Sequence, residues 1–100
     1  MSTKALKKEK IHPYITRNPK ICGGEPIIKG TRISVRLIVE WENAGESVDE
    51  IVAMYPHITH AQVYDALSYY YDHKEEVDQY LKENTEKFVR QKYKGAPWLL

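Results

Sequence analysis

The chain has 100 residues, a single cysteine and a formal net charge of only +1 at pH 7. This length suits one small domain, and one cysteine excludes both a disulfide framework and a cysteine-rich zinc site. The longest aliphatic run, Leu37-Ile38-Val39, is far too short to span a membrane. The first residues lack the apolar stretch of a secretory signal, so we expect a soluble, cytoplasmic protein.

The small net charge conceals a strong segregation of charge along the chain. Residues 1–36 carry nine Lys and Arg against two acids, whereas residues 37–71 carry six acids and no Lys or Arg. Residues 72–86 have a balance of −4, and residues 87–100 have a balance of +4. The sequence therefore predicts two basic ends and an acidic middle, an order that any account of binding partners has to respect.

The N-terminal third favours strands and turns. We expect residues 1–10 to form a mobile basic arm. The stretch Ile15-Thr16-Arg17 is β-prone, and residues 27–28 and 33–35 flank the pair Lys29-Gly30. Glycine in such a turn suits a tight hairpin, so the pattern predicts a hairpin with its turn at Lys29-Gly30.

Helical signals begin at Ser34. This residue can cap a helix that ends before Gly45. Ser47 and Thr59 each begin a capping box, and the proline after Tyr55 ends the first of these two helices.

The resulting outline is a helix over residues 47–55, a four-residue turn and a helix over residues 60–73, which is typical of a helix-turn-helix. The alternative is that any small helical domain contains such a corner. We predict a mainly α fold, in which a helix-turn-helix-like helical domain follows a small N-terminal β-hairpin.

Apolar residues continue at heptad spacing beyond this outline. A continuous helix over residues 60–93 would be about 50 Å long, too long for a domain of this size. We therefore expect a break near His73-Lys74, which divides a domain over residues 11–73 from a C-terminal helix and partner-docking tail over residues 74–100. The heptad positions are Val63, Leu67, Tyr70, Lys74, Val77, Leu81, Asn84 and Phe88.

The charge of the second helix argues against DNA reading by that helix. Residues 60–73 contain no Lys or Arg, although phosphate contacts supply most of the affinity for DNA. If the protein binds DNA, the basic N-terminal region is expected to do so; the alternative is that its cations only solvate a flexible end. The predicted DNA-binding residues are Lys4, Lys7, Lys8, Lys10, Arg17, Lys29, Arg32 and Arg36.

The C-terminal tail mixes cations with aromatic and aliphatic residues, a composition typical of protein interfaces. We expect it to dock on a partner protein, the alternative being that it packs on its own domain. The predicted partner-binding residues are Phe88, Arg90, Lys92, Tyr93, Lys94, Trp98 and Leu99.

No motif predicts catalysis, a cofactor, a bound metal or a small-molecule substrate. The stretch over residues 24–31 lacks the Gly-Lys-Ser/Thr order of a phosphate loop. Cys22 is more simply a small packing residue than a nucleophile. His57 and His60 lie across a turn without a third ligand.

Several motifs in fixed order resemble the family catalogued as domain of unknown function 433. They are the segments Ile15-Thr16-Arg17-Asn18-Pro19, Cys22-Gly23-Gly24-Glu25-Pro26-Ile27-Ile28-Lys29-Gly30-Thr31-Arg32-Ile33, Gly45-Glu46-Ser47, Glu50-Ile51 and Tyr55-Pro56. The resemblance covers residues 12–72. It implies a prokaryotic protein with a small hairpin and a helix-turn-helix-like domain, antitoxin-like and paired with a toxin that resembles PIN-domain ribonucleases.

The sequence thus predicts a non-enzymatic, dimeric, antitoxin-like protein. Its C-terminal segment would neutralise a PIN-like nuclease toxin, with Arg90, Lys92 or Lys94 approaching the acidic metal site, and its basic N-terminal region would bind DNA. The alternatives are a DNA-binding transcriptional regulator without a toxin, and a structural adaptor that associates with itself through the heptad positions.

Overall fold

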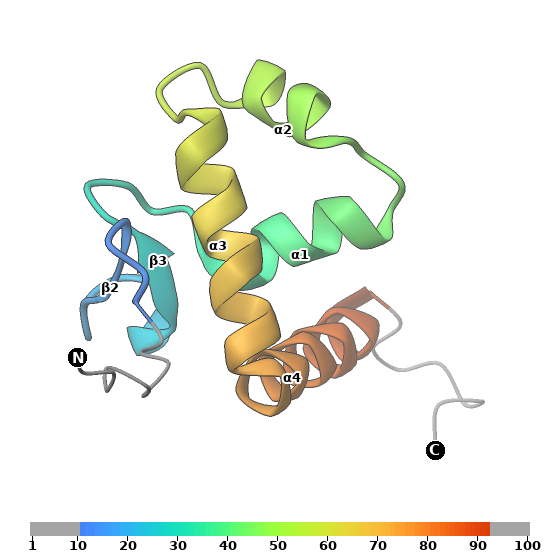
Figure 1. Cartoon of the computed structure of the whole chain (residues 1–100). Helices are drawn as coiled ribbons and strands as arrows, with labels where there is room; N and C mark the ends of the chain where they lie inside the picture. The colour runs from blue at the N-terminus through green and yellow to red at the C-terminus, as the bar shows by residue number, and fades with distance from the viewer. Residues whose placement is uncertain (1–10, 93–100) are drawn as a thin grey trace.

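A short antiparallel hairpin precedes four α-helices in the described part of the chain, residues 11–92 of the computed structural model (Figure 1). This arrangement confirms the mainly α fold class. The elements in chain order are β2 (Ile15–Arg17), the 3-10 turn η1 (Cys22–Gly24), β3 (Pro26–Ile28), α1 (Val35–Asn43), α2 (Val48–Met54), α3 (His60–Asp72) and α4 (Lys74–Lys92).

The hairpin differs from the predicted one, which paired residues 27–28 with residues 33–35 around Lys29-Gly30. β2 pairs with β3, so that Ile15 lies opposite Ile28 and the turn region between the strands contains η1. After Gly30 the chain adds only a single bridge, between Ile27 and Ser34. The prediction of a strand over residues 33–35 is wrong, because the hydroxyl of Ser34 accepts a hydrogen bond from the amide of Leu37 and so starts α1 directly.

The helix boundaries follow the predicted caps. Ser47 and Glu50 form a complete capping box at the start of α2, and Thr59 and Gln62 form another at the start of α3. The amide of Gly45 (φ +97°) donates to the carbonyl of Glu42 and closes the end of α1. These short-range hydrogen bonds satisfy the backbone groups that a helix end leaves open.

The predicted break near His73-Lys74 is confirmed. α3 ends at Asp72, His73 leaves the helical region (φ −133°, ψ 46°), and α4 begins at Lys74. α4 therefore runs in a different direction from α3 and passes along α1 (Figure 1).

The core lies between α1, α3 and the hairpin, with α2 and the start of α4 closing its ends. Four of the predicted heptad positions are buried here, so they pack within their own chain. The buried core residues are Ile28, Val35, Ile38, Val39, Ile51, Ile58, Val63, Ala66, Leu67, Tyr70 and Val77.

The helices within residues 11–92 do not meet the requirements of a membrane span. None of them is both long enough and apolar enough to cross a lipid bilayer.

Candidate nucleic-acid interface

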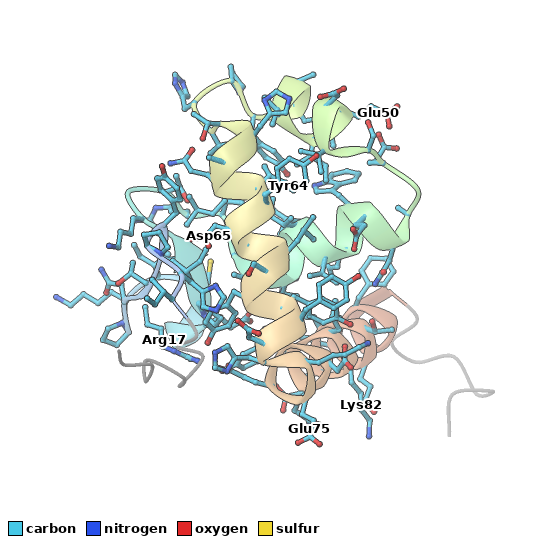
Figure 2. All side chains as sticks on the ribbon, viewed as in Figure 1. Arg17, Glu50, Tyr64, Asp65, Glu75 and Lys82 are labelled. Carbon is cyan, nitrogen blue, oxygen red and sulfur yellow. The ribbon has the colours of Figure 1, made fainter. Side chains whose placement is uncertain are left out.

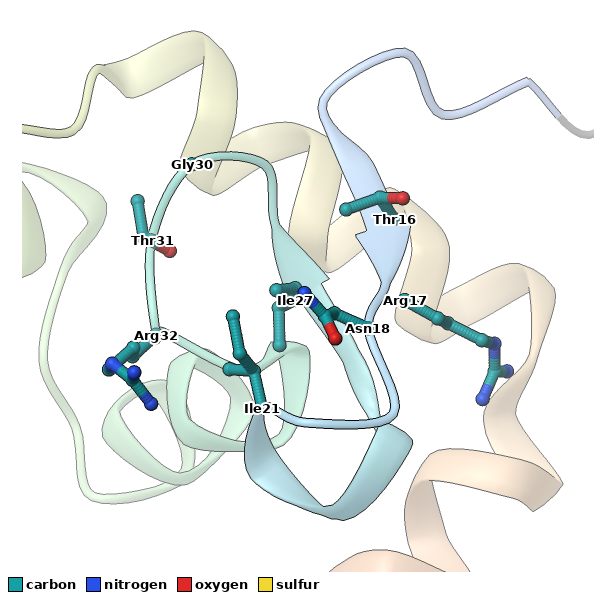
Figure 3. Close-up of a pocket in the computed structure, with 8 residues that line it drawn as sticks. All are labelled: Thr16, Arg17, Asn18, Ile21, Ile27, Gly30, Thr31 and Arg32. Carbon is teal, nitrogen blue, oxygen red and sulfur yellow. The ribbon is translucent and has the colours of Figure 1, made fainter.

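The hairpin carries an open hollow of about 580 Å³ between the turn that follows β2 and the loop over residues 29–32 (Figure 3). Ile21 and Ile27 form its apolar floor, and polar side chains surround it. The lining residues are Thr16, Arg17, Asn18, Ile21, Ile27, Gly30, Thr31 and Arg32.

Local hydrogen bonds fix both sides of this hollow. The side-chain oxygen of Asn18 accepts a hydrogen bond from the backbone amide of Lys20 at 2.9 Å. On the other side, the hydroxyl of Thr31 donates to the carbonyl of Ile28 at 2.8 Å and accepts the amide of Ile33 at 3.0 Å. Such side-chain-to-backbone bonds stabilise turns, so the rim of the hollow is preformed.

Three exposed cations lie in the segments that form the hollow and lack an acidic partner: Arg32 lines it, and Lys20 and Lys29 directly precede the lining residues Ile21 and Gly30. Lys20, Lys29 and Arg32 are exposed, and none of the ion pairs among residues 11–92 includes them. We refer to these three residues as the hairpin cations. Exposed, unpaired Lys and Arg side chains are the groups that contact nucleic-acid phosphates.

Arg17, also predicted to bind DNA, is instead engaged with α3 and α4. Its side chain points away from the hollow (Figure 3), forms an ion pair with Glu76 and donates to the hydroxyls of Tyr69 at 2.8 Å and Tyr80 at 3.4 Å. The hydrogen bond with Glu76 is the main reason that the pKa of Arg17 lies above its ordinary value. Arg17 thus joins the hairpin to the helices.

Arg36 is likewise part of the fold. Its guanidinium forms ion pairs with Glu25 at 3.1 Å and Glu40 at 3.0 Å, and the side chain is only 18% exposed. Of the predicted DNA-binding residues within the described part, the structure therefore leaves Lys29 and Arg32 unpaired. The sequence reasoning missed Lys20, an exposed residue in the turn between the lining residues Asn18 and Ile21, whose amide donates to the Asn18 side chain.

A second polar cluster was not predicted. The side chain of His12 is only 6% exposed and faces two carboxylates. Its Nδ1 lies 3.5 Å from Asp65 Oδ1 and its Nε2 lies 2.9 Å from Asp72 Oδ2, and neither contact has the geometry of a hydrogen bond. The amide of Tyr14 donates to Asp65 at 2.8 Å. The only sequence signal was the seven-residue spacing of the two acids, which places them on one face of α3.

The other predicted site residues lie at or beyond the end of the described chain. Phe88 is 59% exposed on α4, beside a hollow that Arg36 and Glu40 also line. Arg90 and Lys92 lie within α4. Those outside the described residues are Lys4, Lys7, Lys8, Lys10, Tyr93, Lys94, Trp98 and Leu99.

Metal-binding clusters are not found within residues 11–92, where no three His, Cys, Asp or Glu side chains are grouped as a metal site requires. The Sγ atom of Cys22 donates to the carbonyl of Arg32 at 3.4 Å, so the thiol has a packing and hydrogen-bonding role in the hairpin.

The fold and its basic face, by which we mean the part of the hairpin that carries the hairpin cations, define a small, mainly α protein with an N-terminal hairpin. The chain belongs to the family described as Protein of unknown function (DUF433), which matches residues 15–70. This confirms the family resemblance on the hairpin and the first three helices; α4 lies outside the matched residues.

A solved structure supports the same assignment. The chain is similar to a DUF433 member protein from Anabaena variabilis ATCC 29413, with 32% sequence identity and a TM-score of 0.67. The similarity covers 69% of this chain and 68% of that one. A comparison with curated proteins gives no match.

Proposed function

We propose that the chain is a non-catalytic, antitoxin-like protein that binds DNA on the hairpin and a nuclease-type protein through its C-terminal segment. The observation that carries the DNA-binding part is the position of the hairpin cations. All three are exposed on the two segments that form one hollow, which Arg32 itself lines, and they lack an acidic partner within the described residues, whereas Arg17 and Arg36 are held in ion pairs.

The acidic helices support the choice of the hairpin over α3. Residues 37–73, which include α2, α3 and all of α1 except its first two residues, contain no Lys or Arg. A helix without cations cannot neutralise phosphates, so in this proposal α3 does not enter a DNA groove. The basic segment over residues 1–10, which precedes the hairpin in the sequence, would supply further cations.

The salt dependence of DNA binding tests this part. The full chain is titrated into a fluorescent 20-base-pair duplex at several salt concentrations, and the slope of log K against log salt is compared between variants. This slope is negative, and each lost phosphate contact makes it shallower by about 0.9. Replacing Lys20, Lys29 and Arg32 together by alanine should therefore make it shallower by about 2.7 if each contacts one phosphate.

Lys82 provides the matched control, because it is an exposed lysine of α4 that lies away from the hairpin (Figure 2). The change Lys82→Ala should leave the slope unchanged. A triple variant with the wild-type slope, in a chain that binds the duplex, would exclude the hairpin cations from the interface.

The protein-binding part of the proposal is favoured by Phe88. This side chain is 59% exposed although it is large and apolar, and it lies on the last described turns of α4. Exposed aromatic residues are enriched in protein interfaces. The family resemblance adds a PIN-like nuclease as the expected partner.

Copurification from the source cells tests this part. The tagged full chain is isolated at moderate salt, and any protein retained at equal stoichiometry is assayed for ribonuclease activity that the chain inhibits. Phe88→Ala should weaken retention, whereas Met54→Ala, at an apolar residue of α2 that is 39% exposed, should not. Equal retention by both variants, or a retained protein without nuclease activity, would contradict this assignment.

A further inference from the structure

The outer face of α3 carries an uncharged stripe that neither the core nor the proposed DNA contact uses. Ala61, Tyr64, Ser68 and Tyr71 follow one another in steps of three, four and three, which places them on one side of the helix. All four are exposed, Tyr64 by 59% and Tyr71 by 64%. In Figures 1 and 2, α3 crosses in front of α1, and Tyr64 is labelled on it.

The two tyrosines are unusual for a surface. Within the described residues no ion pair or hydrogen bond holds their hydroxyls, yet the ring of Tyr71 already packs against Tyr70, with centroids 5.2 Å apart. A partly fixed aromatic side chain loses little conformational entropy on binding. Tyrosine also buries a large apolar area while keeping a polar tip, which is why it is frequent in interfaces.

The order of small and large side chains along the stripe makes it complementary to a second copy of itself that runs in the opposite direction. From the start of α3, small residues at 61 and 68 alternate with tyrosines at 64 and 71. Two such helices packed antiparallel, with a two-fold axis level with Ala66, place residue 64 of one at the height of residue 68 of the other. The same axis places residue 71 at the height of residue 61.

We propose that this face of α3 is where a second copy of the chain docks, related by this two-fold axis. Tyr64 then packs over the partner's Ser68, and Tyr71 packs over the partner's Ala61. An isologous contact needs a self-complementary patch, and small residues opposite large ones allow the helix axes to approach to about 8–10 Å.

The absence of charge on the stripe favours a second copy of the chain over nucleic acid as the partner. None of its four residues is charged, so two identical stripes meet without burying a charge or opposing like charges. Binding of DNA or RNA would require Lys or Arg side chains, and the stripe has neither.

The buried area sets the expected strength. A tyrosine buries about 200 Å² when fully covered, so four tyrosines that are about 60% exposed supply roughly 500 Å². Neighbouring residues add to this, but the total remains in the range of weak complexes, below about 1,200 Å². We therefore expect a dimer that forms at about 100 µM and dissociates near 1 µM.

Sedimentation velocity of the full chain from about 1 µM to 1 mM tests the proposal. The wild type should pass from monomer to dimer across this range. Tyr71→Ala should raise the dissociation constant at least about tenfold. The control Tyr14→Ala removes another exposed tyrosine, 41% exposed and preceding β2, and should leave the constant unchanged.

A size exchange tests the two-fold register itself. Ala61→Tyr alone places two tyrosines at the same height and should abolish the dimer. Adding Tyr71→Ala to that variant restores a small residue opposite a large one, and the dimer should return. Circular dichroism confirms that each variant keeps its helices. A wild type that stays monomeric at 1 mM, a dimer insensitive to Tyr71→Ala, or an exchange variant that does not recover would each overturn the proposal.

Discussion

Glu76 joins the hairpin to α3 and α4, and its replacement by glutamine measures what this joint contributes to stability. Its carboxylate forms an ion pair with Arg17 and accepts hydrogen bonds from the hydroxyls of Tyr69 at 2.9 Å and Tyr80 at 3.2 Å. Glutamine keeps the shape of the side chain but removes the charge. The variant therefore loses the charge-assisted part of the contact with Arg17 and leaves the guanidinium without its counter-ion.

The expected loss follows from burial. Hydrogen bonds to charged groups contribute about 1.5–3 kcal/mol, and the 46% exposure of the Arg17 side chain moves the value toward the lower end. We expect Glu76→Gln to lower the free energy of unfolding at pH 7 by about 1–2 kcal/mol. For a domain of this size the melting temperature should fall by about 5–10 °C.

The effect should depend on pH with a defined sign. Burial raises the pKa of Glu76, but the hydrogen bonds from Arg17, Tyr69 and Tyr80 outweigh it, so the pKa lies below its ordinary value of 4.5. A lowered pKa in the folded state stabilises the protein above the unfolded value, and this stabilisation is lost as the pH falls through the folded value. The difference between wild type and Glu76→Gln should therefore be full at pH 7 and shrink at pH 3.

Thermal unfolding followed by circular dichroism at pH 7, 5 and 3 measures this difference. Glu86→Gln is the control, because Glu86 is exposed on the same helix and should change the melting temperature little. The reasoning would be refuted if Glu76→Gln melted like the wild type at pH 7, or if the difference were the same at pH 3.

Two further substitutions test local contacts. Tyr55→Phe removes the hydroxyl that accepts the indole N–H of Trp41 at 2.8 Å; it should cost about 1 kcal/mol in chemical denaturation, with Tyr14→Phe as the control at a ring that is 41% exposed. Thr59→Ala removes the cap of α3 and should also cost about 1 kcal/mol, whereas Thr59→Ser keeps the cap oxygen and should retain most of that stability. Equal denaturation midpoints for the alanine and serine variants would show that the cap contributes nothing.

The helices could be predicted from the sequence because their signals are local. The cap oxygen of Ser47 and its partner amide at Glu50 are three residues apart, and the same holds for Thr59 and Gln62. Such contacts need no knowledge of the rest of the chain. The break at His73 was predicted in another way, from the length that an unbroken helix would have.

The hairpin could not be predicted in the same way. Ile27 and Ile28 have β-prone segments on both sides, and the choice between residues 15–17 and residues 33–35 depends on competition with a helix cap. Ser34 decides it, because its side chain starts α1 and leaves Ile15 to pair with Ile28. Strand pairing is set by the fold as a whole more than by intrinsic preference.

The basic face could be predicted in outline only. Charge counting found the N-terminal cations but could not tell which of them are paired. Arg17 and Glu76 are 59 positions apart, and His12 is separated from Asp65 and Asp72 by most of the domain. These partners meet only in the folded chain. The structure was therefore needed to show that Arg17 is paired while Lys29 and Arg32 are not.

The way the hairpin is attached determines how it can unfold. Its two strands have three residues each, and an isolated pair of this length is not stable in water. Each part is fixed to a different helix: Tyr14 to α3 through Asp65, Arg17 to α4 through Glu76, and Glu25 to α1 through Arg36. We therefore expect the hairpin and the helical core to unfold as one cooperative unit. A protease that cuts locally opened segments would find no separately opening hairpin, and the basic face persists for as long as the core does.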